Sequence, residues 1–334
     1  MTEQIDLIKL PELPIIELVD DPVQVYKEFM LIRAALQLGL FDWMDNANRA
    51  TIKEISEGTG IKEEYAAAFM ATLYCLDIVR RAHDEYYLSP SAKLHFVHSS
   101  SYYQGDIIIE LGNESSPWYD LKTFLTHPDE KSEFYPKTKG MAAAETEQEI
   151  RGIVKNTVMV VSRWEGFKDA HTFLEMSRGH GLYAIAVCQM HPSIKATVVS
   201  TPEYETLLEK NIKSFGMEER ITIIEQTAAD AEYDIVLASH AFYGKCISSC
   251  VDEIAKILVQ GGLFISNHWF NKPSEGTGMQ GLCELELAFH MRYSTLSSQE
   301  EFEQICAQHQ LDIFQTGMMR SKDGESTIHM AIKG

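Results

Sequence analysis

The sequence predicts an α/β protein, in which a parallel sheet carries helices on both faces and follows a smaller helical domain. From residue 167 onward, apolar segments of strand length alternate with segments of helix length, which is the pattern of a parallel sheet. The first hundred residues instead show successive helical patterns and then a hairpin. With 334 residues, the chain is long enough for two domains that have separate cores.

Composition limits the classes of partner. The 49 acidic and 29 basic residues give a net charge of −20, and no basic stripe interrupts this excess. Because a phosphate backbone repels such a surface, nucleic acid is not expected as a partner. No apolar run is long enough to cross a membrane, and the N-terminus lacks the pattern of a signal peptide, so we expect a cytoplasmic protein. Six scattered cysteines in mostly apolar contexts indicate reduced, buried thiols.

Residues 1–98 are predicted to form a winged-helix domain. Its predicted elements are helices over 23–43, 51–60 and 63–76 and a hairpin that turns at His83–Asp84. Gly39 marks a turn, Thr51 opens a capping box, and Gly60 ends the short helix. The helix that would contact DNA in such a unit begins with two acids and carries hardly any base. We therefore expect the domain to serve dimerisation.

Residues 99–166 are predicted to be a helical connector rich in aromatic side chains. Such side chains mostly pack domains together, but they can also cover a pocket for a flat organic substrate, and the sequence leaves both possibilities open. The acidic stretches at 145–149 and 300–303 are expected to be solvated faces of helices.

Residues 167–334 are predicted to form the sheet domain. Its strands are expected at 172–176, 196–200, 221–225, 233–238 and 262–267, with a closing hairpin at 311–320 and 326–332. Gly179 and Gly181 supply a tight turn between the first strand and a helix over 182–190. This strand–loop–helix–strand unit is built like those that bind a nucleotide cofactor. In such sheets, ligands lie at the carboxyl ends of the strands.

Seven segments keep a common order and spacing over nearly the whole chain. They are AALQLGLFD at 34–42, IKEISEGTG at 52–60, YYLSP at 86–90, FxxxxxFLE at 167–175, ERITIIE at 219–225, YDIVLASH at 233–240 and LVQGGLFI at 258–265. Together they resemble the plant and bacterial small-molecule O-methyltransferases. The resemblance implies a Rossmann-like class I methyltransferase fold with a mostly parallel seven-stranded sheet, S-adenosylmethionine as cofactor, a small-molecule substrate, and a homodimer formed through the winged-helix domain.

The resemblance also assigns the cofactor site, and this chain departs from the family there. The assigned positions are Glu175, Ser177, Gly179, Gly181, Ser200, Glu203 and Thr227. Ser177 and Arg178 stand where the family has glycines, which let the backbone approach the cofactor. Ser200 replaces the acid that accepts both ribose hydroxyls, and Thr227 replaces the acid that contacts adenine. Glu203 lies one turn beyond Ser200 and is the nearest substitute. Binding of S-adenosylmethionine is therefore expected to be impaired.

Four titratable side chains are the catalytic candidates. His240 follows the fourth predicted strand and Tyr243 stands where the resemblance places a general-base histidine; His268 ends the fifth strand and His290 lies on the helix that covers the substrate in the family. Converging imidazoles and a phenol favour proton transfer. The three histidines also have the composition of a metal site, but Tyr243 and Gly244 replace the ligands of the iron-bearing relatives, so no metal is expected.

Three functions are compatible with this pattern. Loss of cofactor contacts beside dense acid–base groups favours an enzyme of secondary metabolism that has been repurposed to non-methylating chemistry, such as cyclisation, elimination or isomerisation of a flat or polyketide-like molecule. The first alternative is an S-adenosylmethionine-dependent methyltransferase with an unorthodox cofactor site. The second is a catalytically silent homologue that pairs with another protein or binds a metabolite.

Overall fold

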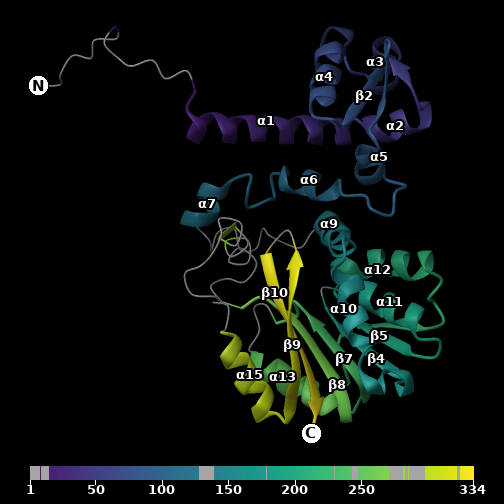
Figure 1. The fold of residues 1–334 in the computed structure, drawn as a ribbon, viewed down its shortest axis with the longest axis vertical. Helices are drawn as coiled ribbons and strands as arrows, with labels where there is room; N and C mark the ends of the chain where they lie inside the picture. The colour runs from purple at the N-terminus through teal and green to yellow at the C-terminus, as the bar shows by residue number, and fades with distance from the viewer. Residues whose placement is uncertain are drawn as a thin grey trace, which may run out of the picture. The chain divides into compact units, whose positions relative to one another are not determined.

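The structure is a computed structural model in which the chain divides into two compact units, residues 1–112 and 113–334 (Figure 1). The residues that it describes are 8, 15–127, 139–177, 179–228, 230–242, 247–270, 281–282, 285, 298–321 and 324–334. Among the predicted site residues, Tyr243 and His290 lie outside the described residues, as does Arg178, and the side chain of Glu203 is also outside them.

The first unit contains the predicted helices and hairpin. Its elements are α1 (Glu17–Gln37), α2 (Leu40–Ala47), β1 (Ala50–Thr51), α3 (Ile52–Thr59), α4 (Glu63–Cys75), β2 (Val79–Ala82), β3 (Glu85–Leu88), α5 (Pro90–Phe96) and α6 (Asp106–Leu111). The helical pattern over 23–43 is two helices, α1 and α2, because Gly39 between them adopts a left-handed conformation. The strands pair antiparallel in the order β1-β3-β2.

The local signals of the first unit are formed as predicted. The Thr51 hydroxyl accepts a hydrogen bond from the Glu54 backbone N–H while the Glu54 carboxylate accepts one from the Thr51 N–H, which is the predicted capping box. Gly60 ends α3 in a left-handed conformation. A single core, with Phe41, Ile55 and Leu73 among its fully buried members, joins these elements.

The second unit is built on a seven-stranded sheet. Its strands are β4 (Thr172–Met176), β5 (Lys195–Val199), β6 (Ile221–Ile224), β7 (Tyr233–Ser239), β8 (Leu258–His268), β9 (Leu311–Ser321) and β10 (Gly324–Lys333). They lie in the order β6-β5-β4-β7-β8-β10-β9. The first five strands of that order run parallel, and β10 pairs antiparallel with β8 and β9. The predicted mostly parallel seven-stranded sheet is thus confirmed, and β8 begins four residues earlier than predicted.

Helices cover both faces of this sheet. The helices of the second unit are α7 (Leu121–Thr126), α9 (Lys139–Glu149), α10 (Ile153–Val161), a 3₁₀ turn (Glu165–Asp169), α11 (Leu182–Met190), α12 (Pro202–Ser214), α13 (Ile247–Ile257) and α15 (Gln299–Gln308). On one face, α10, α11 and α12 pack in one core with Leu237 of β7, and on the other, α13 and α15 pack with its neighbour Val236. Successive residues of a strand point to opposite faces, so β7 is apolar on both sides.

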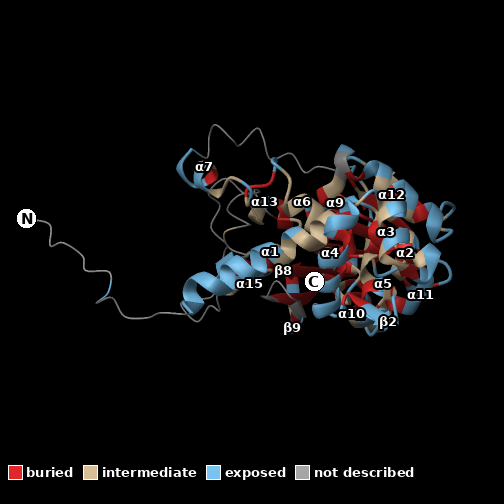
Figure 2. Cartoon of the chain, turned by 90° about the horizontal axis from the view of Figure 1, so that it is seen from above, coloured by how far each residue is buried: buried red, intermediate tan, exposed pale blue. Residues whose placement is uncertain are grey.

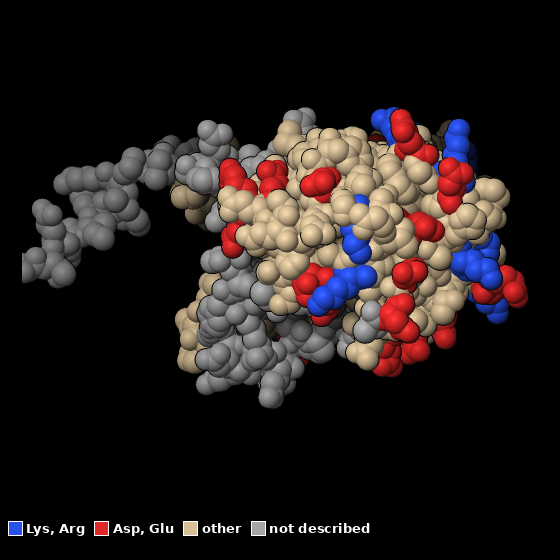
Figure 3. Space-filling view, turned by 90° about the horizontal axis from the view of Figure 1, so that it is seen from below, with Lys and Arg blue, Asp and Glu red and all other residues tan. Residues whose placement is uncertain are grey.

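Part of the predicted connector packs with the sheet domain. Val154, Val158 and Val161 of α10 lie in the core beside α11. Exposed residues are concentrated on outer helix surfaces such as those of α1 and α15 (Figure 2). On the face drawn in Figure 3, basic side chains are interspersed among acidic ones. None of the helices among the described residues is long and apolar enough to span a bilayer.

Two expectations about single segments were wrong. Glu145, Glu147 and Glu149 of α9 are buried, with at most 9% of each residue exposed, whereas 145–149 was expected to be a solvated face. The acidic pattern of a helix does not reveal what packs over it. Cys75 is exposed, while the thiols of Cys188, Cys250 and Cys306 are free and buried as expected.

Candidate active site

The candidate site lies beside β4, from which the chain adds strands first on one side of the sheet and then on the other. Moving along the chain from β4, the sheet grows through β5 and β6 on one side, and through β7 and β8 on the other. The carboxyl ends of β4 and β7 therefore flank a topological switch point, where parallel sheets of this kind bind their ligands. Glu175 near the end of β4 and Ser239 at the end of β7 mark the two sides.

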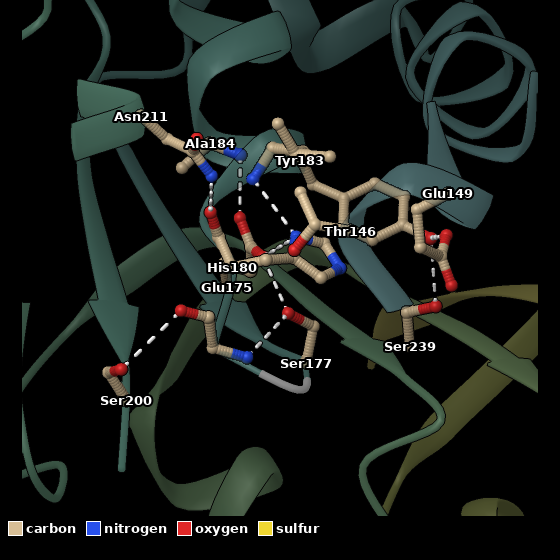
Figure 4. Close-up of polar contacts among 12 residues, drawn as sticks. Thr146, Glu149, Glu175, Ser177, His180, Tyr183, Ala184, Ser200, Asn211 and Ser239 are labelled. Carbon is tan, nitrogen blue, oxygen red and sulfur yellow. Dashed lines mark hydrogen bonds and ion pairs between the residues drawn. The ribbon is translucent and has the colours of Figure 1, made fainter. Parts of the chain in front are cut away.

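The loop after β4 is held from within by Glu175. The Ser177 hydroxyl donates a hydrogen bond to one carboxylate oxygen of Glu175 at 2.5 Å, and the Ala184 N–H donates to the other at 2.7 Å (Figure 4). Ser177 also accepts a hydrogen bond from the Gly179 N–H at 3.3 Å. The side chain that replaces a glycine thus turns back into the loop.

Gly179 and Gly181 keep the conformations that such a loop needs. Both have positive φ, +93° and +75°, which residues other than glycine rarely adopt. A Cβ on Gly181 would lie 2.2 Å from the Leu208 side chain, and one on Gly179 would lie 3.0 Å from the Ser200 hydroxyl. The loop is therefore pressed against the end of β5 and against α12.

Glu175 is fully buried, and this burial raises its pKa to about 7. The hydrogen bonds from Ser177 and Ala184 oppose the shift, and the charge of Glu149 adds to it. The ring of His180 lies close, with Nδ1 at 3.7 Å from a Glu175 oxygen. Since Nδ1 accepts a hydrogen bond from the Leu182 N–H at 3.2 Å, it carries no proton in this arrangement.

A buried polar network crosses the switch point beside this loop. Tyr183, in the first turn of α11, donates a hydrogen bond to Glu149 at 2.7 Å and lies 3.1 Å from the hydroxyl oxygen of Ser239 (Figure 4). The Asn267 amide of β8 donates to that hydroxyl at 3.4 Å. Burial and the charge of Glu149 raise the pKa of Tyr183 well above its usual value, so its phenol stays protonated.

His240 joins the network at the end of β7. Its backbone is left-handed, with φ +51°, and its backbone N–H donates a hydrogen bond to the backbone carbonyl of Asn267 at 2.8 Å. Its ring lies over Trp269, with centroids 4.2 Å apart, and its Nε2 lies 3.5 Å from the Asn267 amide nitrogen. Its ring therefore faces the same network as Ser239.

His268 lies in a different environment from His240. It follows Asn267 in β8 and points to the opposite face, where its ring makes edge contacts with Phe242 and Phe270. Burial, with the nearby His329, lowers the pKa of His268 to about 4. The structure thus does not bring the two predicted strand-end histidines into one polar cluster.

The remaining cofactor candidates lie at the ends of β5 and β6. The Ser200 hydroxyl is buried and makes contacts of 3.4 Å with the Gly179 carbonyl and 3.3 Å with the Thr201 carbonyl. Glu203 lies in the first turn of α12, and Thr227 is half-buried beyond the end of β6. Within the described residues, no cluster of three or more His, Cys, Asp or Glu side chains has the arrangement of a metal site.

Sequence reasoning missed Glu149, Tyr183, Ser239 and Asn267. The available signals were weak: a tyrosine two residues after Gly181, and three acids in one short helix. Tyr183 lies in an otherwise apolar helix and reads as a core residue, so its polar partners were not predictable.

Comparison with known structures agrees with this arrangement. An O-methyltransferase family protein from Burkholderia thailandensis matches with a TM-score of 0.76 and 17% identity, covering 97% of this chain and 99% of that one. PigF, solved with S-adenosylhomocysteine, matches at 0.74 and 16%, covering 95% and 99%. Human N-acetylserotonin methyltransferase, solved with S-adenosylmethionine, matches at 0.73 and 15% over the full length of both chains.

Sequence comparison adds little to the structural one. An uncharacterized protein, MJ0086 of Methanocaldococcus jannaschii, is 25% identical over 279 residues, which cover 80% of this chain and 73% of that protein. No family model matches the chain. The structural matches confirm that the chain has the fold of the small-molecule O-methyltransferases over nearly its whole length.

Proposed function

We propose that the protein is an S-adenosylmethionine-dependent methyltransferase that acts on a small molecule, with a cofactor site that departs from the usual pattern. The observation that carries this proposal is the inward turn of Ser177, whose hydroxyl bonds to Glu175 and to the Gly179 N–H. The side chain replaces a glycine without entering the space beside the loop. The two similar structures that hold S-adenosylmethionine or its product lend support.

The residues at the switch point suit one end of this cofactor better than the other. When bound, S-adenosylmethionine supplies an electrophilic methyl group on a positively charged sulfur. Among the described residues, the carboxyl groups of Glu175 and Glu149 lie beside the loop, and a carboxylate attracts a cation. At the ribose end, by contrast, Ser200 already contacts two backbone carbonyls and offers no carboxylate.

The weak ribose end predicts a reduced affinity. A hydrogen bond to a charged group contributes roughly 1.5–3 kcal/mol, so the loss of the ribose acid would weaken binding roughly 10- to 150-fold. A weakened affinity is compatible with methyl transfer.

His240 is the candidate general base among the described residues. Its ring lies at the carboxyl end of β7, and its left-handed backbone and the stacking of Trp269 fix the ring's direction. It would accept the proton of the acceptor hydroxyl or amine. His268, with a pKa near 4 and aromatic neighbours, is suited to a structural role or to accepting a proton only transiently.

The contact between the Ser200 hydroxyl and the loop favours a second candidate function. If the ribose end does not accept a nucleoside, His240 and the Tyr183 network remain as an acid–base set for non-methylating chemistry, such as cyclisation, elimination or isomerisation.

Calorimetric titration of the ligand-stripped protein separates the two candidates. We expect S-adenosylmethionine and S-adenosylhomocysteine to bind with micromolar dissociation constants, and incubation with phenol and amine acceptors to yield products heavier by one methylene group. No binding at millimolar cofactor would contradict methyl transfer and favour the second candidate.

The protein is also proposed to be a homodimer through its first unit. Val19, Val23, Tyr26 and Met30 are all exposed and recur along one side of α1 at helical spacing. An exposed apolar stripe of this kind marks an interaction surface.

A further inference from the structure

A chain of hydrogen bonds connects the candidate base His240 with an acid of α9. Tyr183 donates to Glu149 at 2.7 Å, and its oxygen lies 3.1 Å from the Ser239 hydroxyl oxygen (Figure 4). The side-chain nitrogen of Asn267 lies 3.4 Å from that hydroxyl oxygen and 3.5 Å from Nε2 of His240. Each of the five residues is buried, with at most 8% of its surface exposed. The chain is therefore shielded from bulk water, where direct hydrogen bonds have their largest effect.

The direction of each hydrogen bond in this chain follows from the one before it. A phenol has one proton, and Tyr183 donates it to the Glu149 carboxylate, so the phenol oxygen can only accept from Ser239. The single proton of the Ser239 hydroxyl is then used, and this hydroxyl accepts in turn from the Asn267 amide. The amide therefore presents its NH₂ group, and not its oxygen, to Ser239 and to His240.

The same NH₂ group determines which nitrogen of the His240 ring carries a proton. Because two donors cannot form a hydrogen bond with each other, Nε2 is the acceptor, and a neutral ring carries its proton on Nδ1. The left-handed backbone of His240 and the stacking of Trp269 hold the ring in this orientation. At 3.5 Å the contact is long for a hydrogen bond, so the lone pair of Nε2 stays available to a proton from a ligand.

We propose that Asn267 and Tyr183 are positioning residues that make Nε2 the proton-accepting nitrogen of His240, in a role that rests on the function proposed above. Nε2 takes the proton of the acceptor hydroxyl or amine while a lone pair of that oxygen or nitrogen forms the bond to the methyl carbon. The electrons of the methyl–sulfur bond return to sulfur. Neither positioning residue has to contact the reacting atoms, because each acts through the state of the imidazole ring.

Removal of the Tyr183 hydroxyl should release the direction of the chain. In Tyr183→Phe the Ser239 hydroxyl loses its acceptor and can donate to Asn267 instead. The side-chain oxygen of Asn267 has no hydrogen-bond partner among the described residues, so a half-turn of the amide gives up no hydrogen bond at that oxygen. After the half-turn the oxygen faces Nε2 and favours a proton there. Tyr183→Phe thus alters the His240 ring through two intervening side chains.

The test is the tautomer of His240, measured by long-range ¹H–¹⁵N correlation on the full chain with labelled histidine. At about pH 8.5 a histidine with the usual pKa of about 6.5 is neutral, and a ring nitrogen without a proton resonates far from one that carries a proton. The signals of His240 are those that disappear in His240→Asn. Tyr183→Phe and Asn267→Asp are the test variants, and the second puts an acceptor in place of the NH₂ group. Tyr233→Phe is the matched control, because it makes the same change at the amino end of β7.

We expect the wild-type protein and Tyr233→Phe to carry the proton on Nδ1. Tyr183→Phe should move the ratio of the two tautomers toward Nε2–H by roughly 2- to 10-fold, the effect of one neutral hydrogen bond, and Asn267→Asp should move it further. In methyl-transfer assays Tyr183→Phe should lower kcat by a similar factor and leave the KM of the acceptor within about twofold, because a positioning residue acts on the base and not on binding.

Three results would overturn the assignment. A wild-type proton on Nε2 would mean that the NH₂ group does not face this nitrogen. An unchanged ratio in Tyr183→Phe would mean that Tyr183 does not set the direction, and this variant decides alone if Asn267→Asp does not fold. An equal change in Tyr233→Phe would attribute the effect to the loss of any phenol from the sheet domain. The expected tautomers in a protein that does not bind S-adenosylmethionine would instead contradict the proposed function and support the positioning of His240 alone.

Discussion

The Ser177 hydroxyl donates a 2.5 Å hydrogen bond to the Glu175 carboxylate, so the residue that replaces a loop glycine stabilises the loop from inside. Its effect on ligand binding should therefore be small. We expect Ser177→Gly to change the dissociation constant of S-adenosylmethionine by less than about fivefold, because the change frees no space beside the loop.

The same substitution should reduce stability. Loss of a buried hydrogen bond costs roughly 0.5–1.5 kcal/mol, and the added glycine makes the unfolded chain more flexible. Urea unfolding and calorimetry on the same samples would measure both effects. A gain in affinity of tenfold or more would contradict the inward orientation of Ser177.

Ser200 offers the opposite experiment. Ser200→Asp would restore a carboxylate at the end of β5, where the ribose hydroxyls are expected, and should tighten S-adenosylmethionine binding by roughly 10-fold or more. The free protein should become less stable, because an aspartate cannot donate to the carbonyls of Gly179 and Thr201 that Ser200 now contacts. Ser200→Ala is the control, with the same lost contacts and no new acceptor. If Ser200→Asp and Ser200→Ala bind the cofactor equally well, the ribose does not lie at this strand end.

His240 can be tested without disturbing its unusual backbone. Asparagine tolerates the left-handed conformation, so His240→Asn keeps φ near +51° and removes the imidazole. If His240 is the general base, kcat should fall roughly 10²- to 10⁴-fold while cofactor affinity stays within a few-fold. His268→Asn serves for comparison. Unchanged turnover in His240→Asn would assign the base to another residue.

The fold could be predicted because its signals are local. Strand-length apolar runs, the capping box at Thr51, and the glycines at 39 and 60 each specify the backbone within a few residues. The order of the segments then allowed the whole fold to be predicted through the resemblance.

The site was harder to predict because its partners come from distant segments. Glu149 and Tyr183 are 34 residues apart, and Tyr183 and Ser239 are 56 apart. An acidic helix reads as solvated whether or not another element covers it. The orientation of Ser177 was not predictable for a related reason, since the identity of a residue does not show whether its side chain points into the loop or out of it.

The stripe on α1 gives a prediction about assembly. A charge in its centre, as in Val23→Glu, should convert a dimer into a monomer, since an unpaired buried carboxylate is costly in an apolar interface. Gln24→Glu is a suitable control, because it adds the same single charge to the same helix at an exposed residue about 100° around the helix from Val23. Sedimentation equilibrium on the three proteins would measure the masses. A wild-type monomer, or a dimer in Val23→Glu, would contradict the assignment of α1 to the interface.

Two buried groups should make opposite contributions to the pH dependence of stability. Glu175 has a raised pKa of about 7, so the folded protein holds a proton that the unfolded chain releases above about pH 4.5. Its contribution is present at low pH and is lost as the pH rises towards 7. His268 has a pKa lowered to about 4. Below about pH 6.5 the unfolded chain therefore takes up a proton at this histidine, whereas the folded protein does not until the pH approaches 4. Its contribution is lost as the pH falls from 6.5 towards 4.

Each shift corresponds to about 3 kcal/mol at 1.36 kcal/mol per pH unit, so the two slopes oppose each other in the wild-type protein between pH 4.5 and 6.5. Single substitutions should expose them. In Glu175→Gln the free energy of unfolding should rise with pH across this window, and in His268→Leu it should fall. Urea unfolding at pH 4.5, 5.5 and 6.5 would measure the three profiles. Parallel profiles for all three proteins would mean that neither group titrates differently in the folded and unfolded states.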